Sequence, residues 1–558
     1  MKPLDWVVMF GWLVLLVGYG LWRGRKSGTV NDYLLAGKTM PWYAMGLSIM
    51  ATQASAITFI STTGQAYVDG MRFVQFYFGL PLAMVLICIT AVPLFHRANV
   101  YTAYEYLENR FDARVRGLVS VIFLIQRGLA AGISLYAPAV VLSVILGWSD
   151  RWTTILMGTL VVLYTTTGGI KAVTWADVQQ MMVIFAALIL ALGVAIYLMP
   201  HEVSFRGALS VAGALGRLRT VDTQLDWNNR YNLWSGLIGG LFLALAYFGC
   251  DQSQVQRYLT GKSIAQSRLS LVFNALAKIP MQFFILFIGA MVFVLFIFEK
   301  PPLIFHPAEM AKLEQRQADL APVQAEYDRA FAERRSAALD VAEHGDAGLA
   351  RLKEAQKEFD SVRQKGAKLV SSSFNDTNYI FLHYVTHYLP VGVVGLVVAV
   401  IFTAAMSSVS GEINSLATVT VIDVYRRHAK QNASDRHYLW ASKFFTAFWG
   451  IYAMVFANFA KGFGALIEAV NMIGSLFYGG LLGVFVLAFY FKKVGAKGAF
   501  FGVLLGEAAI FWSNKYTGIS YLWYNVIGAV VVIASGILIS LVNGEWTERT
   551  AAGHRTGA

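Results

Sequence analysis

The most informative stretch of the sequence reads GLSIMATQASAIT and runs from Gly46 to Thr58. It lies inside an apolar run long enough to cross a membrane, yet Gln53, Ser55 and Thr58 gather polar groups near its middle. Polar groups in hydrocarbon must be paired or must face a cavity. A helix interrupted at this point would free main-chain carbonyls, which are good cation ligands. The alternative is that the hydroxyls only pack against neighbouring helices.

The whole chain has the composition of a membrane protein. Of its 558 residues, 57% are hydrophobic and only 14% are charged, whereas soluble domains carry about 25% charged residues. The net charge of +12 fits basic loops on one side of a membrane better than it fits nucleic acid. The two cysteines, Cys88 and Cys250, exclude a disulfide framework. We find no metal motif, phosphate-binding loop or nucleophile–base pair, so an enzyme is not expected.

Apolar stretches long enough to cross a bilayer number about 13. They cover residues 5–23, 41–69, 73–96, 117–147, 151–169, 177–199, 232–258, 270–298, 390–424, 438–460, 464–491, 497–515 and 520–541. Lys and Arg gather in alternate loops, which are expected to be cytoplasmic. The sequence therefore predicts an all-α, multi-pass protein of the plasma (inner) membrane, in contact with lipid. Its N-terminus would lie outside, and its C-terminal tail (542–558) would lie in the cytoplasm.

Residues 306–368 differ from the rest because they are rich in Ala, Glu, Lys, Arg and Gln. Apolar residues recur at helical spacing on both sides of a turn at 344–348, which predicts an antiparallel, coiled-coil-like helical hairpin. It would stand on the outer face and would separate membrane helices 1 to 8 (residues 1–300) from helices 9 to 13 (390–541). The hairpin is either a solvated spacer or a docking site for an external partner.

A second polar stretch runs from Ala404 to Thr418 inside the ninth apolar run. Ala404, Ser407 and Ser408 have the spacing that places three residues on one helix face. Two hydroxyls together with free carbonyls would form an uncharged oxygen cage, which suits a hard monovalent cation. The alternative is a seam of small residues that lets two helices pack closely.

Two charged residues fall within or beside apolar runs. Asp177 stands at the start of the run 177–199, where it is either a functional carboxylate or a helix N-cap. Arg127 lies near the middle of the run 117–147, where an arginine needs a carboxylate, carbonyls or a bound anion. Its partner would be either an anionic solute or an intramembrane acid such as Glu412 or Glu468.

Several motifs together identify a family resemblance. They are YLLAGK (33–38), AYEYLENRF (103–111), the run 168–177, DQSQVQRY (251–258), the run 404–423 and GVFVL (483–487). With these motifs the chain resembles the sodium:solute symporters over about residues 5–510. The resemblance implies a five-plus-five inverted repeat of the LeuT-like type. The first repeat would cover about 41–199 and the second about 232–491, with one extra helix before them and two after.

The resemblance also implies the binding residues. Sodium would be held by the carbonyls of Ala51, Ala54 and Ala404 and by the hydroxyls of Ser407 and Ser408. Asp177 and Ser410 would serve a second sodium or the coupling. The solute would contact Gln53, Thr58, Tyr77, Arg127, Tyr247, Phe248 and Asn471. The hydrogen-bonding residues of the sugar transporters are matched by Thr58, Tyr77 and Ala244, which argues against a hexose.

The expected function is therefore secondary active transport. Sodium and a small solute, an organic anion that Arg127 could clamp, would enter together by alternating access. Sodium is the co-transported ion and not a prosthetic group. The alternative is a transporter-like sensor that reports the solute to a partner protein.

Overall fold

The computed structural model describes residues 1–24, 29–372, 374–459 and 465–546. Over these residues the chain is helical, with one isolated bridge between Met40 and Gly261, so the predicted all-α class is confirmed. Most of the predicted tail, residues 547–558, lies outside this description.

The helices follow one another along the chain with mostly short connections, the main exception being the long loop between α10 and α11. They are α1 (Pro3–Gly24), α2 (Val30–Leu35), α3 (Trp42–Gln53), α4 (Ala56–Asp69), α5 (Leu80–Ile89), α6 (Ala91–Ala98), α7 (Ala103–Arg110), α8 (Ala113–Leu146), α9 (Asp150–Tyr197), α10 (Phe205–Ala214), α11 (Gly240–Gly249), α12 (Gln252–Leu259), α13 (Ile264–Phe298), α14 (Pro307–Glu314), α15 (Gln317–His344), α16 (Leu349–Val370), α17 (Thr377–Tyr388), α18 (Val393–Val419), α19 (Asp435–Ala457), α20 (Leu466–Tyr490), α21 (Ala496–Tyr516) and α22 (Leu522–Val542).

Within the described residues, nine helical segments are long and apolar enough to cross a membrane, and two shorter apolar helices accompany them. Several predicted crossings consist of two shorter pieces. The run α9 covers two predicted crossings, because Gly169 turns the chain inside it with φ 61° and ψ −179°. A side chain at this glycine would collide with Tyr33, so the tight turn requires glycine. The exact number of 13 crossings stays a prediction.

The predicted interruption at Gln53–Thr58 is present. Helix α3 ends at Gln53, Ala54 and Ser55 leave the helical conformation, and α4 begins at Ala56. The Thr58 hydroxyl donates a hydrogen bond of 2.7 Å to the carbonyl of Gln53. The break therefore lies where the polar residues of the sequence cluster.

A second interruption, which the sequence analysis did not predict, separates α11 from α12. Cys250 and Asp251 leave the helix, and the Asp251 carboxylate accepts a hydrogen bond of 2.9 Å from the main-chain N–H of Ser253 at the start of α12. The two broken helices are the first helices of the two proposed repeats. Their matching breaks support the inverted-repeat arrangement, while the repeat boundaries remain as predicted from sequence.

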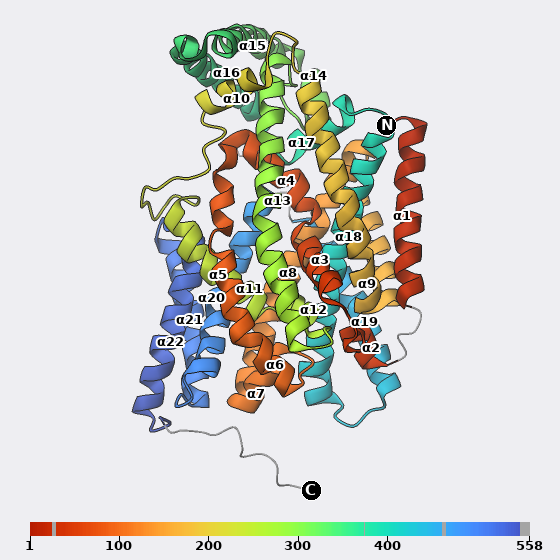
Figure 1. Cartoon of the computed structure of the whole chain (residues 1–558), viewed down its shortest axis with the longest axis vertical. Coiled ribbons are helices and arrows are strands. Elements are labelled where there is room, and N and C mark those ends of the chain that lie inside the picture. Colours follow the sequence, from red (N-terminus) through yellow and green to blue (C-terminus); the bar gives the residue numbers. More distant parts are fainter. Residues whose placement is uncertain (25–28, 373, 460–464, 547–558) are drawn as a thin grey trace.

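The hairpin α15–α16 stands at one end of the molecule, the end at which the N-terminus also lies (Figure 1). The last helix, α22, finishes at the opposite end. The inner face of the hairpin packs against the transmembrane helices. Ala337, Ala338, Val341 and Leu352 belong to the same buried apolar cluster as the central helices.

Candidate functional site

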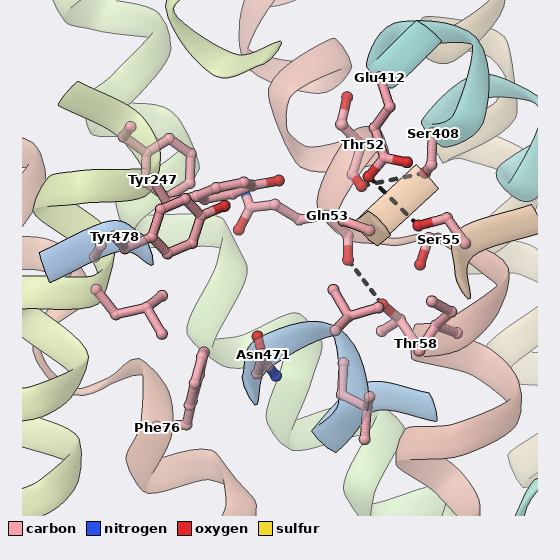
Figure 2. A pocket seen from close by; sticks show the side chains of 18 of the residues that line it. Thr52, Gln53, Ser55, Thr58, Phe76, Tyr247, Ser408, Glu412, Asn471 and Tyr478 are labelled. Atoms are coloured by element: carbon pink, nitrogen blue, oxygen red, sulfur yellow. Dashed lines mark hydrogen bonds between the residues drawn. The ribbon is translucent and has the colours of Figure 1, made fainter. Parts of the chain in front are cut away.

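A central cavity of about 110 Å³ lies between the break in α3–α4 and helices α8, α11, α18 and α20. Figure 2 shows Phe76, Tyr247 and Tyr478 on one side and the polar side chains around the break on the other. The structure places all seven predicted solute-binding residues in its wall, namely Gln53, Thr58, Tyr77, Arg127, Tyr247, Phe248 and Asn471. Ser408 of the predicted sodium set lines it as well.

The aromatic side of the cavity is closely packed. The rings of Tyr247 and Phe248 are 4.8 Å apart, and those of Phe76 and Tyr77 are 4.9 Å apart. On the polar side, the Gln53 amide donates a hydrogen bond of 3.0 Å to Asn274. The amide nitrogen of Asn471 has no partner among the described residues. The cavity therefore offers flat apolar walls and a few polar groups, one of which is free to bind a ligand.

Two of the predicted sodium ligands, Ser407 and Ser408, lie on α18 where it passes the end of α3. The Ser408 hydroxyl donates a hydrogen bond of 3.2 Å to the carbonyl of Thr52, and Ser407 donates to the Asp177 carboxylate. Ala51, Ala54 and Ala404 are fully buried, and Ala54 is the first residue of the break. The Ser408 hydroxyl of α18 thus lies within hydrogen-bond distance of the end of α3, and the sodium site itself stays a prediction.

Asp177 is completely buried and lies inside α9, beyond the turn at Gly169. The N-cap interpretation of Asp177 is therefore wrong. Its carboxylate accepts hydrogen bonds from Ser48 (2.5 Å) and Arg257 (2.9 Å) as well as from Ser407. Ser410, the other residue predicted for a second ion, is buried and its hydroxyl has no partner among the described residues.

Arg127 is held by several groups at once. One guanidinium nitrogen donates to Glu412 at 3.2 Å, and the other donates to Tyr478 at 2.7 Å and to Asp251. The pairing with Glu412 that the sequence left open is present. The pairing with Glu468 is wrong, because Glu468 accepts a hydrogen bond of 2.5 Å from Arg230.

Sequence reasoning missed four residues at this site. Asp251 and Tyr478 hold Arg127, and Arg257 holds Asp177. Lys278, fully buried in α13, donates a hydrogen bond of 3.4 Å to the Gln53 carbonyl at the break. Lys278 could have been found, because a lysine inside an apolar stretch is itself a functional signal.

Comparisons with known proteins identify the family of this chain. The model of the sodium:solute symporter family matches residues 33–324 and 359–506. The chain is 25% identical to the human sodium-coupled monocarboxylate transporter 2, over 97% of this chain and 84% of that protein. It is also 25% identical to the sodium/sialic acid symporter NanT of Aliivibrio fischeri, over 96% of this chain and 92% of that protein.

A solved structure shows the same fold. The substrate-bound, outward-open state of a Na⁺-coupled sialic acid symporter superposes with a TM-score of 0.75 at 24% identity, over 97% of this chain and 98% of that one. The fold is that of the LeuT-like transporters. The chain therefore belongs to the sodium:solute symporter family, whose members are sodium-coupled membrane transporters and not enzymes.

Proposed function

We propose that this sodium-coupled symporter imports a small organic anion, a monocarboxylate or a similar acid, across the plasma (inner) membrane by alternating access. The observation that carries the proposal is the shared wall of one cavity. Ser408 and the break at Gln53–Ser55 belong to the proposed cation site, and they line the same space as the proposed solute-binding side chains. A cation bound there would stabilise the wall that the solute contacts, which is the physical basis of coupling.

The sodium ion would be bound by the carbonyls of Ala51, Ala54 and Ala404 and by the hydroxyls of Ser407 and Ser408. The present hydrogen bond from Ser408 to Thr52 supports this assignment, because it shows that the hydroxyl reaches the end of α3. Ser407 lies against Asp177, so a carboxylate stands directly behind the site. Asp177, with Ser410 one turn further along α18, would serve the coupling or a second ion.

The balance of buried charge favours an anionic solute. Arg127, Arg257 and Lys278 carry three positive charges in their ordinary ionised forms, and Asp177, Asp251 and Glu412 carry three negative ones. With all six groups ionised, their sum is zero before any ligand binds. One sodium adds a positive charge to a region of low dielectric constant, and one carboxylate restores neutrality. The named relatives, which transport monocarboxylates and sialic acid, point to the same class of solute.

Arg127 would bind the solute by exchanging a partner. Its contact with Glu412 is 3.2 Å long, and its Nε atom is buried without a partner among the described residues. A solute carboxylate could take the place of Glu412 while Asp251 and Tyr478 continue to hold the other side of the guanidinium. The remaining contacts would come from Gln53, Thr58, Tyr77, Tyr247, Phe248 and Asn471.

The proposal also includes an orientation in the membrane. The N-terminus and the hairpin 306–368 would lie outside and the C-terminus in the cytoplasm, because the basic loops favour that orientation. Neither the site nor the comparisons favour the alternative of a solute sensor. Purified protein in proteoliposomes, given radiolabelled monocarboxylates with and without an inward sodium gradient, tests the proposal. Sodium-dependent accumulation of at least one carboxylate is the expected result.

A further inference from the structure

A second cavity lies far from the central one, under the hairpin. It has a volume of about 280 Å³ and lies between α15 and α16 of the hairpin and the ends of α4 and α13. Three arginines line it, one from each of three segments: Arg217 follows α10, Arg334 lies in α15 and Arg363 lies in α16. Such a convergence of guanidinium groups is typical of sites that bind carboxylates or phosphates.

Among the described residues, only Arg363 of these three arginines has a carboxylate partner. Arg363 forms an ion pair of 3.1 Å with Asp376. Arg217 and Arg334 donate to the carbonyls of Val68 and Phe296, and among the described residues no carboxylate lies within ion-pair distance of either. The guanidinium carbon of Arg334 lies 3.5 Å from the ring centre of Phe359, which holds the group in place. Two cations are thus positioned at the cavity without counter-charges in contact.

Arg334 is the most informative of the three. It has no solvent exposure, and its Nε atom is buried without a hydrogen-bond partner among the described residues. Gln356 is also buried in the cavity wall, and its side-chain oxygen likewise has no hydrogen-bond partner among the described residues. Burial lowers the pKa of Arg334 to about 10, so the group is still charged at neutral pH. A buried charge without a partner is costly, and a bound anion would remove that cost.

The cavity has a net charge of +1. Three arginines contribute three positive charges, and Asp360 and Asp376 contribute two negative ones. A single excess positive charge matches a monoanion better than it matches a phosphate, which carries more than one negative charge near neutral pH. The planar fork of a guanidinium also fits the two oxygens of a carboxylate.

Part of the cavity wall lies outside the residues that match the family. The matched ranges end at 324 and resume at 359, so Arg334 and Gln356 both lie in the unmatched segment. The cavity therefore combines the unmatched part of the hairpin with the ends of two helices of the transporter body. One of these, α4, carries Thr58 of the central cavity at its other end.

We propose that this cavity is a binding site for a small monocarboxylate, held by Arg334 and Arg217, on the outer end of the transporter. The site is separate from the transport site and does not depend on the identity of the transported solute. An anion bound there would join α15 and α16 to the ends of α4 and α13.

The proposal can be tested on the full-length protein in lipid nanodiscs, in sodium-free choline buffer. Hydrogen–deuterium exchange is followed in peptides from residues 327–337 and 352–367 while lactate is added. Lactate is expected to slow exchange in both segments. Arg334→Met should raise the half-saturating lactate concentration about tenfold, because it removes a charged group that contributes roughly 1.4 kcal/mol or more to lactate binding. Asp360→Asn, at an exposed position, should lower the half-saturating lactate concentration about threefold, because it removes a negative charge from the cavity wall.

Asp340→Asn is the matched control, since Asp340 is an exposed hairpin acid that pairs with Arg351 and does not line the cavity. Its half-saturating lactate concentration should equal that of the unchanged protein. Should Arg334→Met fail to fold, the comparison of Asp360→Asn with Asp340→Asn decides alone. Absence of lactate protection in the unchanged protein, or equal shifts in the two Asp variants, would overturn the site. Tighter protection by inorganic phosphate than by lactate would overturn the choice of a monocarboxylate.

Discussion

Ser408 of α18 donates a hydrogen bond of 3.2 Å to the carbonyl of Thr52, the last residue but one of α3. The two residues are separated by 356 positions in the sequence and belong to the two different proposed repeats. A cation between them would be bound by both halves at once. Its binding would therefore depend on how α18 lies relative to the break, which is the relationship that alternating access changes.

The hydroxyl of Ser408 gives the first prediction. Ser408→Ala should raise the sodium concentration for half-maximal uptake about tenfold, because a hydrogen bond or ligand contact to a charged group is worth roughly 1.5–3 kcal/mol. Ser415→Ala is the control, since within the described part of the chain the Ser415 hydroxyl donates only to the carbonyl of Glu412 in its own helix. Unchanged sodium dependence of uptake in the double variant Ser407→Ala, Ser408→Ala would show that these two hydroxyls do not bind sodium.

Asp177 gives the second prediction. Asp177→Asn should weaken sodium coupling and should also lower thermal stability, because it leaves Arg257 buried without its ion-pair partner. Adding Arg257→Gln should recover part of the stability but not the sodium dependence. Thermal unfolding in detergent and sodium titration of uptake measure the two effects separately. Recovery of both by the double variant would show that the pair is only structural.

The first break and its surroundings could be predicted because local sequence carries the signal. Gln53, Ser55 and Thr58 are polar where a lipid-facing helix would be apolar. The break before Asp251 could not be found in the same way, because the preceding residues 240–249 are uniformly apolar or small and Asp251 looks like an ordinary helix cap. The helix α17 was also missed, since its 12 residues are too few to cross a membrane and mix polar with aromatic side chains.

Partners across the fold were harder to predict than positions along a helix. Arg127 needed a carboxylate, carbonyls or a bound anion, and spacing within one helix cannot identify the two acids it contacts, which are 124 and 285 positions away. Of the two acids named as alternatives, Glu468 is not the partner, because it forms an ion pair with Arg230 from the loop before α11. Likewise, the pairing of Asp177 with Arg257 depends on how α9 packs against α12, which no local pattern encodes.

Arg127 gives the third prediction. If the solute carboxylate exchanges with Glu412, Arg127→Lys should raise the half-saturating solute concentration about tenfold, since lysine keeps the charge but loses the planar fork. Glu412→Gln should lower solute-free stability less than Arg127→Ala does, because Asp251 still pairs with the arginine. A large loss of stability in Arg127→Ala that Glu412→Gln repairs, with no effect on solute binding, would instead show a purely structural pair.

The hairpin gives the fourth prediction. Replacing residues 308–366 with a short Gly/Ser linker should lower thermal stability, because Ala337, Val341 and Leu352 pack into the central apolar cluster. Inserting two glycines after Gly345, where an added side chain would meet no atom within 4 Å, is the control and should have little effect. An unchanged unfolding temperature on replacement of the hairpin would contradict this packing.

The central claim is that one cavity couples a sodium ion to a small organic anion. The most direct measurement is the uptake of a panel of labelled monocarboxylates, sialic acid, a hexose and a neutral amino acid into proteoliposomes, with sodium or choline outside. We predict that an inward sodium gradient drives accumulation of a carboxylate, and that Ser407→Ala, Ser408→Ala abolishes the gradient's effect. Sodium-driven accumulation of the hexose or of the neutral amino acid, with no carboxylate transported, would contradict the account.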